Sequence, residues 1–309
     1  MMKKVFLALL GAILLMGACA PVSHLPSAPN KAEAVVAALH DPGSRYVVVV
    51  SHRGDWRNYP ENSLPAIESV IRMGVDMVEL DLKMTKDSVL VLSHDRTLNR
   101  CSTGSGKISD YTYAELQAFD LKRAHGIAIP GLKIPTLREA LALCKDRITV
   151  NVDQGYEYYD QVLAIAEELG VTDQILIKGS RPWNEVKAKL ESHPRNLMYM
   201  PVISSLQKGE SRLLTGYLEA PVPQMAYELC FNELNDNVRV AARKVLDSGS
   251  KVWINTLWAS LCGGYDDDSA FAAKDPAEVY DVILGLGASI IQTDRPGLLI
   301  DYLKKEGRR

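Results

Sequence analysis

The sequence predicts an α/β fold, a TIM-type (β/α)8 barrel, from three observations. Eight apolar, β-rich runs recur along the chain, segments with helix start and stop signals separate them, and 309 residues suit one barrel of this class. The eight runs are Tyr46–Val50, Met77–Leu82, Ile148–Asp153, Gln174–Lys178, Leu197–Val202, Gln224–Tyr227, Lys251–Asn255 and Ser289–Gln292.

The segments between the runs carry helix punctuation. Asn62 or Ser63 begins a helix that ends at Gly74, where glycine permits the left-handed conformation of a C-terminal cap. Thr136 and Glu139 form a capping box before another apolar helix. Strands and helices therefore alternate, as a parallel barrel requires.

A ninth apolar run, Val89–Ser93, does not fit this alternation. Only about six residues separate it from Met77–Leu82, whereas a parallel neighbour needs a crossover of about a dozen or more. We therefore expect an antiparallel β-hairpin after strand two. The polar segment from about residue 95 to 135, with one short helix at Tyr113–Ala118, is expected as an insertion at the catalytic end that partly covers the site.

The N-terminus predicts export and lipid anchoring. Lys3 and Lys4 precede an apolar core, Val5–Met16, that is too short to span a membrane. The junction Met-Gly-Ala-Cys19 resembles a bacterial lipoprotein box, which implies a signal peptide at 1–18 and a lipidated Cys19. A plain cleaved signal is the alternative. We expect a tether and leading segment at 19–44, the barrel domain at 45–309, and a location in the bacterial cell envelope outside the cytoplasm.

Composition excludes one class of partner. The chain has 35 basic and 38 acidic residues and no basic block, so we expect no nucleic-acid binding. The other cysteines show no metal-ligand spacing, and Cys144 and Cys230 are expected to be buried, small apolar residues. Disulfide pairing and oligomeric state stay open.

Carboxylates mark the candidate metal site. Glu79 and Asp81 lie two residues apart in strand two and therefore share a face, and Asp153 ends strand three. Strand ends meet at one edge of a barrel, so the three acids should converge. An oxygen-only set selects a hard cation, Ca²⁺ or Mg²⁺. The alternative is that lysine or arginine partners neutralise the pair.

Two histidines flank the acids. His52 ends strand one, and His94 ends the predicted hairpin, which returns it toward Glu79 and Asp81. Histidine titrates near neutral pH, which suits acid–base catalysis. Arg53 is either a clamp for an anion or a salt-bridge partner of Glu61.

These residues resemble one known family. The segments SHRGDWRNYPENS and VELDLKMTKDSVLVLSHDRTLNRCSTGSG are similar to the signature of glycerophosphodiester phosphodiesterases. The resemblance is dense from Ser51 to about Leu116 and continues loosely to Tyr302. It implies a barrel with an insertion, catalytic roles for His52 and His94, and a metal bound by Glu79, Asp81 and the acid of strand three.

The third strand departs from the family pattern. Asp153-Gln154-Gly155 stands where Glu-Ile-Lys is usual, so a phosphate-binding lysine is missing and Lys178 is expected to supply its charge. Tyr156 either walls an alcohol pocket or packs a helix start. The residues assigned to binding the substrate or its phosphate are Arg53, Glu61, Tyr156, Lys178 and Trp253.

The resulting hypothesis is metal-dependent hydrolysis of a small-molecule glycerophosphodiester to sn-glycerol 3-phosphate and an alcohol. Attack by water and a cyclic phosphate both stay open. One alternative is a phosphodiesterase for inositol-type or other bulky head groups or lysolipids, and another is a non-catalytic binding lipoprotein. Asp266–Asp268, in an acidic loop after strand seven, either holds a second cation or is a solvated loop.

Overall fold

The computed structural model describes residues 23–123, 126–153 and 155–309, and in these ranges eight parallel strands close a barrel. Its order is β1-β2-β4-β5-β6-β7-β8-β9, and β9 pairs with β1 to close it. The strands are β1 (Val48–His52), β2 (Met77–Met84), β4 (Thr149–Asp153), β5 (Ile175–Gly179), β6 (Met198–Ile203), β7 (Ala226–Leu229), β8 (Lys251–Asn255) and β9 (Ala288–Thr293). The predicted barrel is confirmed, although β1, β2 and β7 end two residues beyond the predicted runs.

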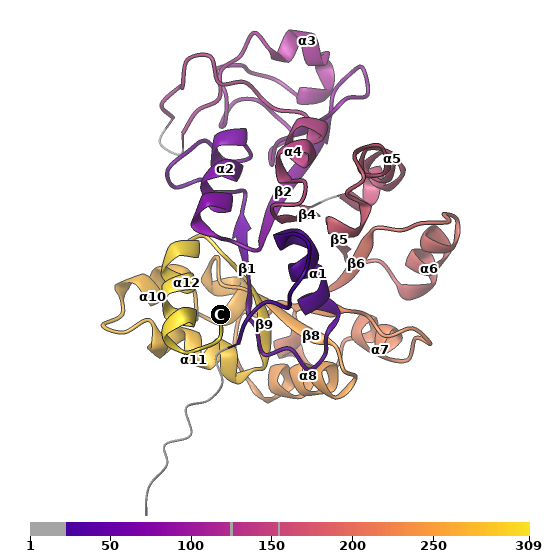
Figure 1. Cartoon of the computed structure of the whole chain (residues 1–309), viewed down its shortest axis with the longest axis vertical. Helices are drawn as coiled ribbons and strands as arrows, with labels where there is room; N and C mark the ends of the chain where they lie inside the picture. The colour runs from indigo at the N-terminus through magenta and orange to yellow at the C-terminus, as the bar shows by residue number, and fades with distance from the viewer. Residues whose placement is uncertain (1–22, 124–125, 154) are drawn as a thin grey trace, which may run out of the picture.

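Helices surround the barrel (Figure 1). They are α1 (Lys31–His40), α2 (Leu64–Met73), α3 (Tyr113–Leu116), α4 (Leu137–Cys144), α5 (Tyr159–Leu169), α6 (Trp183–Glu191), α7 (Arg212–Leu218), α8 (Asp236–Asp247), α9 (Ala259–Cys262), α10 (Asp267–Ala272), α11 (Ala277–Gly285) and α12 (Pro296–Lys305). The punctuation is as predicted: Ser63 caps α2, Gly74 ends it with a φ of 86°, and Thr136 and Glu139 form the capping box of α4.

The predicted hairpin is present. Strand β3 (Leu90–Leu92) pairs antiparallel with the distal half of β2, in the register Leu82↔Leu92 and Met84↔Leu90. The following insertion has a hydrophobic cluster of its own, which explains how a segment with few regular elements holds its shape. Its buried members are Val91, Leu98, Ile108, Leu116, Leu121 and Ile134.

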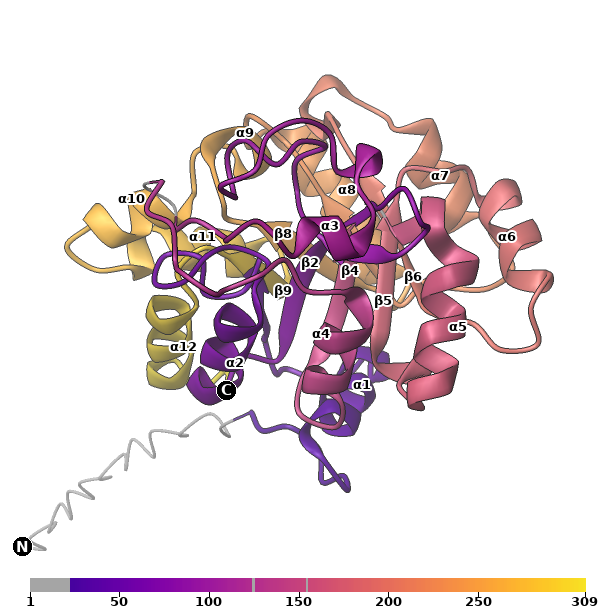
Figure 2. The same ribbon diagram turned by 90° about the horizontal axis from the view of Figure 1, so that it is seen from above.

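The leading helix α1 closes the end of the barrel opposite the insertion. Val35 and Leu39 of α1 join the apolar cluster inside the barrel, which also includes Met77 and Trp253. Figure 2 shows α1 below the barrel and α9 above it. This arrangement leaves the carboxyl ends of the strands free to form a site. Cys144 and Cys230 are buried, as predicted.

Candidate active site

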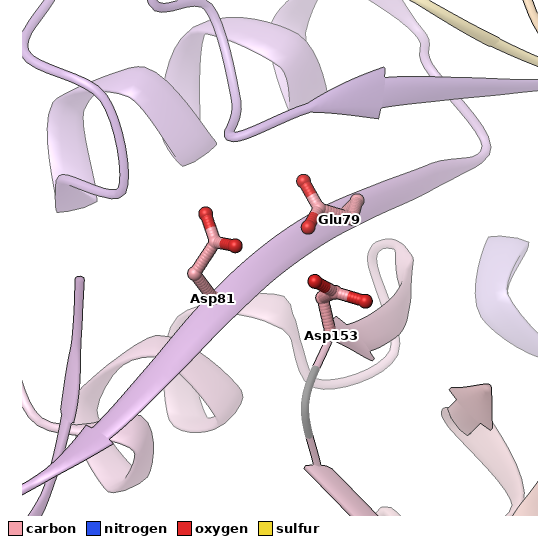
Figure 3. A group of neighbouring side chains, drawn as sticks. All are labelled: Glu79, Asp81 and Asp153. Carbon is pink, nitrogen blue, oxygen red and sulfur yellow. The ribbon is translucent and has the colours of Figure 1, made fainter. Parts of the chain in front are cut away.

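The three predicted metal ligands converge at the carboxyl end of the barrel. Strand β2 pairs with β4 so that Asp81 lies opposite Asp153, and the period of two places Glu79 on the same inner face. One carboxylate oxygen from each of the three lies within 4.8 Å of those of the others. Figure 3 shows the three side chains directed into one space between β2 and the end of β4.

Three carboxylates so close together repel one another unless a positive charge lies between them. Burial, together with the carboxylates of Asp81 and Asp153, raises the pKa of Glu79 well above its ordinary value. Oxygens bound to one Ca²⁺ or Mg²⁺ lie about 2.0 to 2.6 Å from the ion, hence up to about 5 Å from one another. The separation of these three acids therefore fits one hard cation.

Arg53 supplies part of the positive charge. Its guanidinium lies 3.1 Å from Asp81 and 3.1 Å from Glu61, and its backbone N–H donates to Glu79 at 3.0 Å. Arg53 has a φ of 54°, a left-handed conformation that is unfavourable for a side chain larger than glycine. The salt bridge with Glu61 is therefore present, and Arg53 also lines the cavity. Its role as a clamp for an anion stays a prediction.

His52 is held by a residue from the opposite end of the sequence. Its Nδ1 lies 2.8 Å from Oδ1 of Asp294, which follows β9, and the indole N–H of Trp56 donates to the same oxygen. The ring of Trp258 contacts His52 edge-on. An imidazole bound through Nδ1–H to a carboxylate presents its Nε2 for proton transfer.

His94 has a similar partner in a more open setting. Its Nδ1 lies 2.8 Å from Oδ1 of Asp95, and its side chain is 41% exposed. Arg100 binds Asp95 through two nitrogens, each at 2.9 Å, and lowers the pKa of Asp95 far below its usual value. Arg100 also donates twice to Glu61, so a chain of ion pairs links His94 to Arg53.

One cavity of about 450 Å³ unites these groups. Eight predicted residues line it: His52, Arg53, Glu79, Asp81, His94, Asp153, Tyr156 and Lys178. The structure does not bring the other two there. Glu61 lies outside it in the ion-pair chain, and Trp253 is fully buried below it, where its indole N–H donates to Asn255 at 2.6 Å. Cys19 lies outside the described residues.

Comparisons with known proteins identify the family. A model described as the glycerophosphoryl diester phosphodiesterase family matches residues 52–212, just over half of the chain. This chain belongs to the glycerophosphoryl diester phosphodiesterase family. A second model, a domain of unknown function, matches residues 199–303.

Curated relatives of the phosphodiesterase family match the N-terminal part. A glycerophosphodiester phosphodiesterase of Caldanaerobacter subterraneus is 31% identical over 137 residues, which cover 42% of this chain and 56% of the relative. Glycerophosphodiester phosphodiesterase 1 of Bos taurus is 38% identical over 116 residues, 36% of this chain and 35% of that protein. The chain spans about half the length of the first curated relatives it matches.

Solved structures share the fold over most of the chain. A glycerophosphoryl diester phosphodiesterase from Parabacteroides distasonis superposes with a TM-score of 0.73 at 24% identity and covers 92% of this chain and 94% of its own. A phosphodiesterase from Oleispira antarctica, solved with the product sn-glycerol-3-phosphate, gives a TM-score of 0.61 at 19% identity, covering 83% and 96%.

This family member has a glycine just after β4 where the family usually has a phosphate-binding lysine, and the packing around Gly155 accounts for the difference. Gly155 stands at the usual lysine position, and a Cβ there would lie 2.9 Å from Val152 and 3.2 Å from Ile177. A longer side chain therefore does not fit. Lys178 of β5 instead lines the cavity, as the sequence predicts.

Lys178 has buried partners that sequence reasoning missed. Its Nζ lies 3.0 Å from Glu228 of β7 and 3.4 Å from Oε1 of Gln292 of β9. Burial alone would lower the pKa of Lys178, but the carboxylates of Glu228, Asp153 and Glu79 outweigh burial and raise it. The sequence does contain an indication of this role: Glu228 is a single acidic residue in the otherwise uncharged, buried strand β7, at a position that faces into the barrel.

The acidic loop does not form a second cation site in the described residues, where the one suitable group is Glu79, Asp81 and Asp153. Asp266 caps α10, and Asp268 pairs with Arg57 and Arg295. Asp267 is fully buried, so the loop is not simply solvated either. Asp294 was also missed as a site residue, although it belongs to a motif, Gln292-Thr-Asp-Arg-Pro296, at the end of the last strand.

Proposed function

We propose that this protein hydrolyses glycerophosphodiesters to sn-glycerol 3-phosphate and an alcohol, with a divalent cation and paired-histidine catalysis. One observation carries the proposal: a single cavity is lined by three clustered acids and by two histidines, each bound to an aspartate. The family, the names of the relatives and the product bound by the Oleispira antarctica enzyme support the substrate class.

The bound cation and two basic side chains would together neutralise the phosphate of the substrate. Glu79, Asp81 and Asp153 would hold the Ca²⁺ or Mg²⁺, which when bound neutralises a phosphoryl oxygen and orients a glycerol hydroxyl. Lys178 remains charged because its pKa is raised. Together with Arg53, which also lines the cavity, it would balance the negative charge of the substrate phosphate.

The histidines divide the proton transfers. His52 accepts through Nε2 the proton of the attacking oxygen, which belongs to water or to the adjacent glycerol hydroxyl. Attack by the hydroxyl gives a cyclic phosphate, and a water molecule must then add to the phosphorus and break one ring P–O bond to give sn-glycerol 3-phosphate. The P–O bond to the alcohol breaks, and His94 gives a proton to the departing alkoxide. The exposure of His94 supports this order, because a leaving alcohol departs through the open mouth of the cavity.

Phosphorus NMR on mixed glycerophosphodiesters tests the reaction. We expect sn-glycerol 3-phosphate to accumulate, EDTA to stop turnover, and Ca²⁺ or Mg²⁺ to restore it. The spectrum also reports any cyclic intermediate. No turnover with either cation would contradict the proposal and favour a non-catalytic binding protein.

The melting temperature tests the cation site without substrate. Without a cation, the raised pKa of Glu79 means that the folded state holds a proton that the unfolded chain releases near pH 4.5. The free energy of unfolding should then fall as the pH rises from about 4.5 through the folded pKa. Added Ca²⁺ or Mg²⁺ should remove this fall, whereas identical curves with and without cation would contradict the site.

A bulky head group is the second candidate substrate. Tyr156 lines the cavity, and the guanidinium of Arg181 lies 5.6 Å from the centre of its ring, so these two residues form a broad wall beside Gly155. Comparing release of choline, ethanolamine and inositol from deacylated phospholipids distinguishes the cases. A preference for inositol of more than about tenfold in kcat/KM would favour the alternative.

We propose that Cys19 is lipidated after removal of residues 1–18, which anchors the protein in the cell envelope outside the cytoplasm. The support is the sequence alone. Among the described residues no helix is both long and apolar enough to cross a membrane. Mass spectrometry of the N-terminal peptide should find the lipid, and Cys19→Ala should release the protein from membranes. A soluble wild-type protein would contradict this proposal.

A further inference from the structure

Asp267 is a buried carboxylate that the proposed mechanism does not use. It opens helix α10 and is 0% exposed. Its Oδ1 accepts hydrogen bonds from the hydroxyls of Thr256 and Thr293, each at 2.8 Å, and from that of Tyr280 at 3.3 Å. Thr256 follows β8 and Thr293 ends β9, so Asp267 ties together the carboxyl ends of two barrel strands.

The second oxygen of Asp267 reaches the partner of His52. Oδ2 accepts the backbone N–H of Asp294 at 2.6 Å, while the carboxylate of Asp294 binds Nδ1 of His52 at 2.8 Å. The guanidinium of Arg57 donates to the backbone carbonyl of Asp294 at 2.9 Å. Asp267 therefore fixes the main chain from which the Asp294 carboxylate extends.

A carboxyl group at this position is costly. Burial raises the pKa of Asp267 to about 7, in spite of four donated hydrogen bonds. An asparagine has a single acceptor oxygen, so it could not accept both from the hydroxyls at Oδ1 and from the backbone N–H of Asp294 at Oδ2. Acceptance at both oxygens therefore accounts for an aspartate at this position.

We propose that Asp267 is a positioning residue for the catalytic base. It holds the backbone of Asp294 so that Oδ1 stays on Nδ1 of His52 and Nε2 stays directed at the substrate. The inference rests on the proposed function, because it assigns Asp267 to the orientation of the proposed base.

The first test compares two neighbouring aspartates. Asp267→Asn should lower kcat about tenfold and change KM less than about twofold, because a misplaced base affects the chemical step. Asp266→Ala removes the N-cap of the same helix without touching Asp294, and its kcat should stay within about twofold of wild type. An equal loss in both variants, or a change in KM alone, would overturn the proposal.

A double mutant tests the route through Asp294. In an Asp294→Asn background, Asp267→Asn should cost less than about twofold further in kcat, because both changes disturb the same contact. Losses that multiply fully would show that Asp267 acts elsewhere. Should Asp267→Asn not fold, Thr256→Val removes one hydroxyl donor at nearly constant volume and should lower kcat about threefold; an unchanged kcat would count against the proposal.

A final readout does not need turnover. The proton on Nδ1 of His52, assigned by its disappearance in His52→Ala, should give a downfield NMR signal in the wild type that shifts or broadens in Asp267→Asn but not in Asp266→Ala. An unchanged signal in Asp267→Asn would overturn the positioning role. Absence of wild-type turnover with a responsive signal would instead reject the proposed reaction and keep the geometric link.

Discussion

The two histidines of the cavity are held in opposite ways. His52 is buried and binds Asp294, which is 242 residues away in sequence, whereas His94 is 41% exposed and binds the adjacent Asp95. Pairing of β1 with β9 brings the first pair together, so its geometry depends on closure of the barrel. The pair His94–Asp95 is formed by adjacent residues at the end of a hairpin, and Arg100 holds Asp95 in place.

This difference predicts that replacing Asp294 lowers kcat more than replacing Asp95. A buried pair with an additional donor from Trp56 has few alternative positions, and loss of its carboxylate leaves polar groups unsatisfied. An exposed pair can replace a lost partner with water. We therefore expect loss of either proposed catalytic histidine to lower kcat by a similar factor, and loss of Asp294 to lower kcat more than loss of Asp95.

Replacing either histidine should have the largest effect. His52→Ala and His94→Ala should each lower kcat by about 10³-fold or more, since general acid–base groups contribute about 10² to 10⁴. Steady-state kinetics measure this, and circular dichroism should report an intact fold. Retained activity in His94→Ala would refute the pairing of roles.

Asp294→Asn should come next, with a loss of about 10²-fold in kcat, because His52 loses both its orientation and its charged partner. KM should change little, since Asp294 does not line the cavity. A loss below about fivefold would show that burial alone orients His52.

Asp95→Asn should cost only about threefold to tenfold in kcat, because water can solvate the exposed His94. The same assay run beside Asp294→Asn makes a matched pair. Equal losses in the two variants would contradict the contrast between the buried and exposed pairs.

Arg100→Ala should have the smallest effect. Its side chain is 48% exposed, and surface ion pairs contribute about 0 to 1 kcal/mol to the free energy of unfolding. We expect kcat within about threefold of wild type and a small drop in melting temperature. A loss near 10²-fold would mean that the ion-pair chain from Asp95 to Arg53 orients His94.

Much of the site could be predicted because it follows local rules. Glu79 and Asp81 share a face through the period of a strand, and Asp153 joins them because β4 neighbours β2. His94 follows from the short link that forces a hairpin. Trp253 does not line the cavity, because the strand pattern does not tell how deep in the barrel an inward-facing side chain lies.

The sequence by itself determined the alternation of strands and helices, the helix caps and the acid cluster, because these depend on residues close in sequence or on neighbouring strands. Only the tertiary structure decided the pairs His52–Asp294 and Lys178–Glu228 and the burial of Asp267. These contacts cross the barrel or close it, and many inward-facing positions are compatible with one sequence pattern until the strand register is fixed.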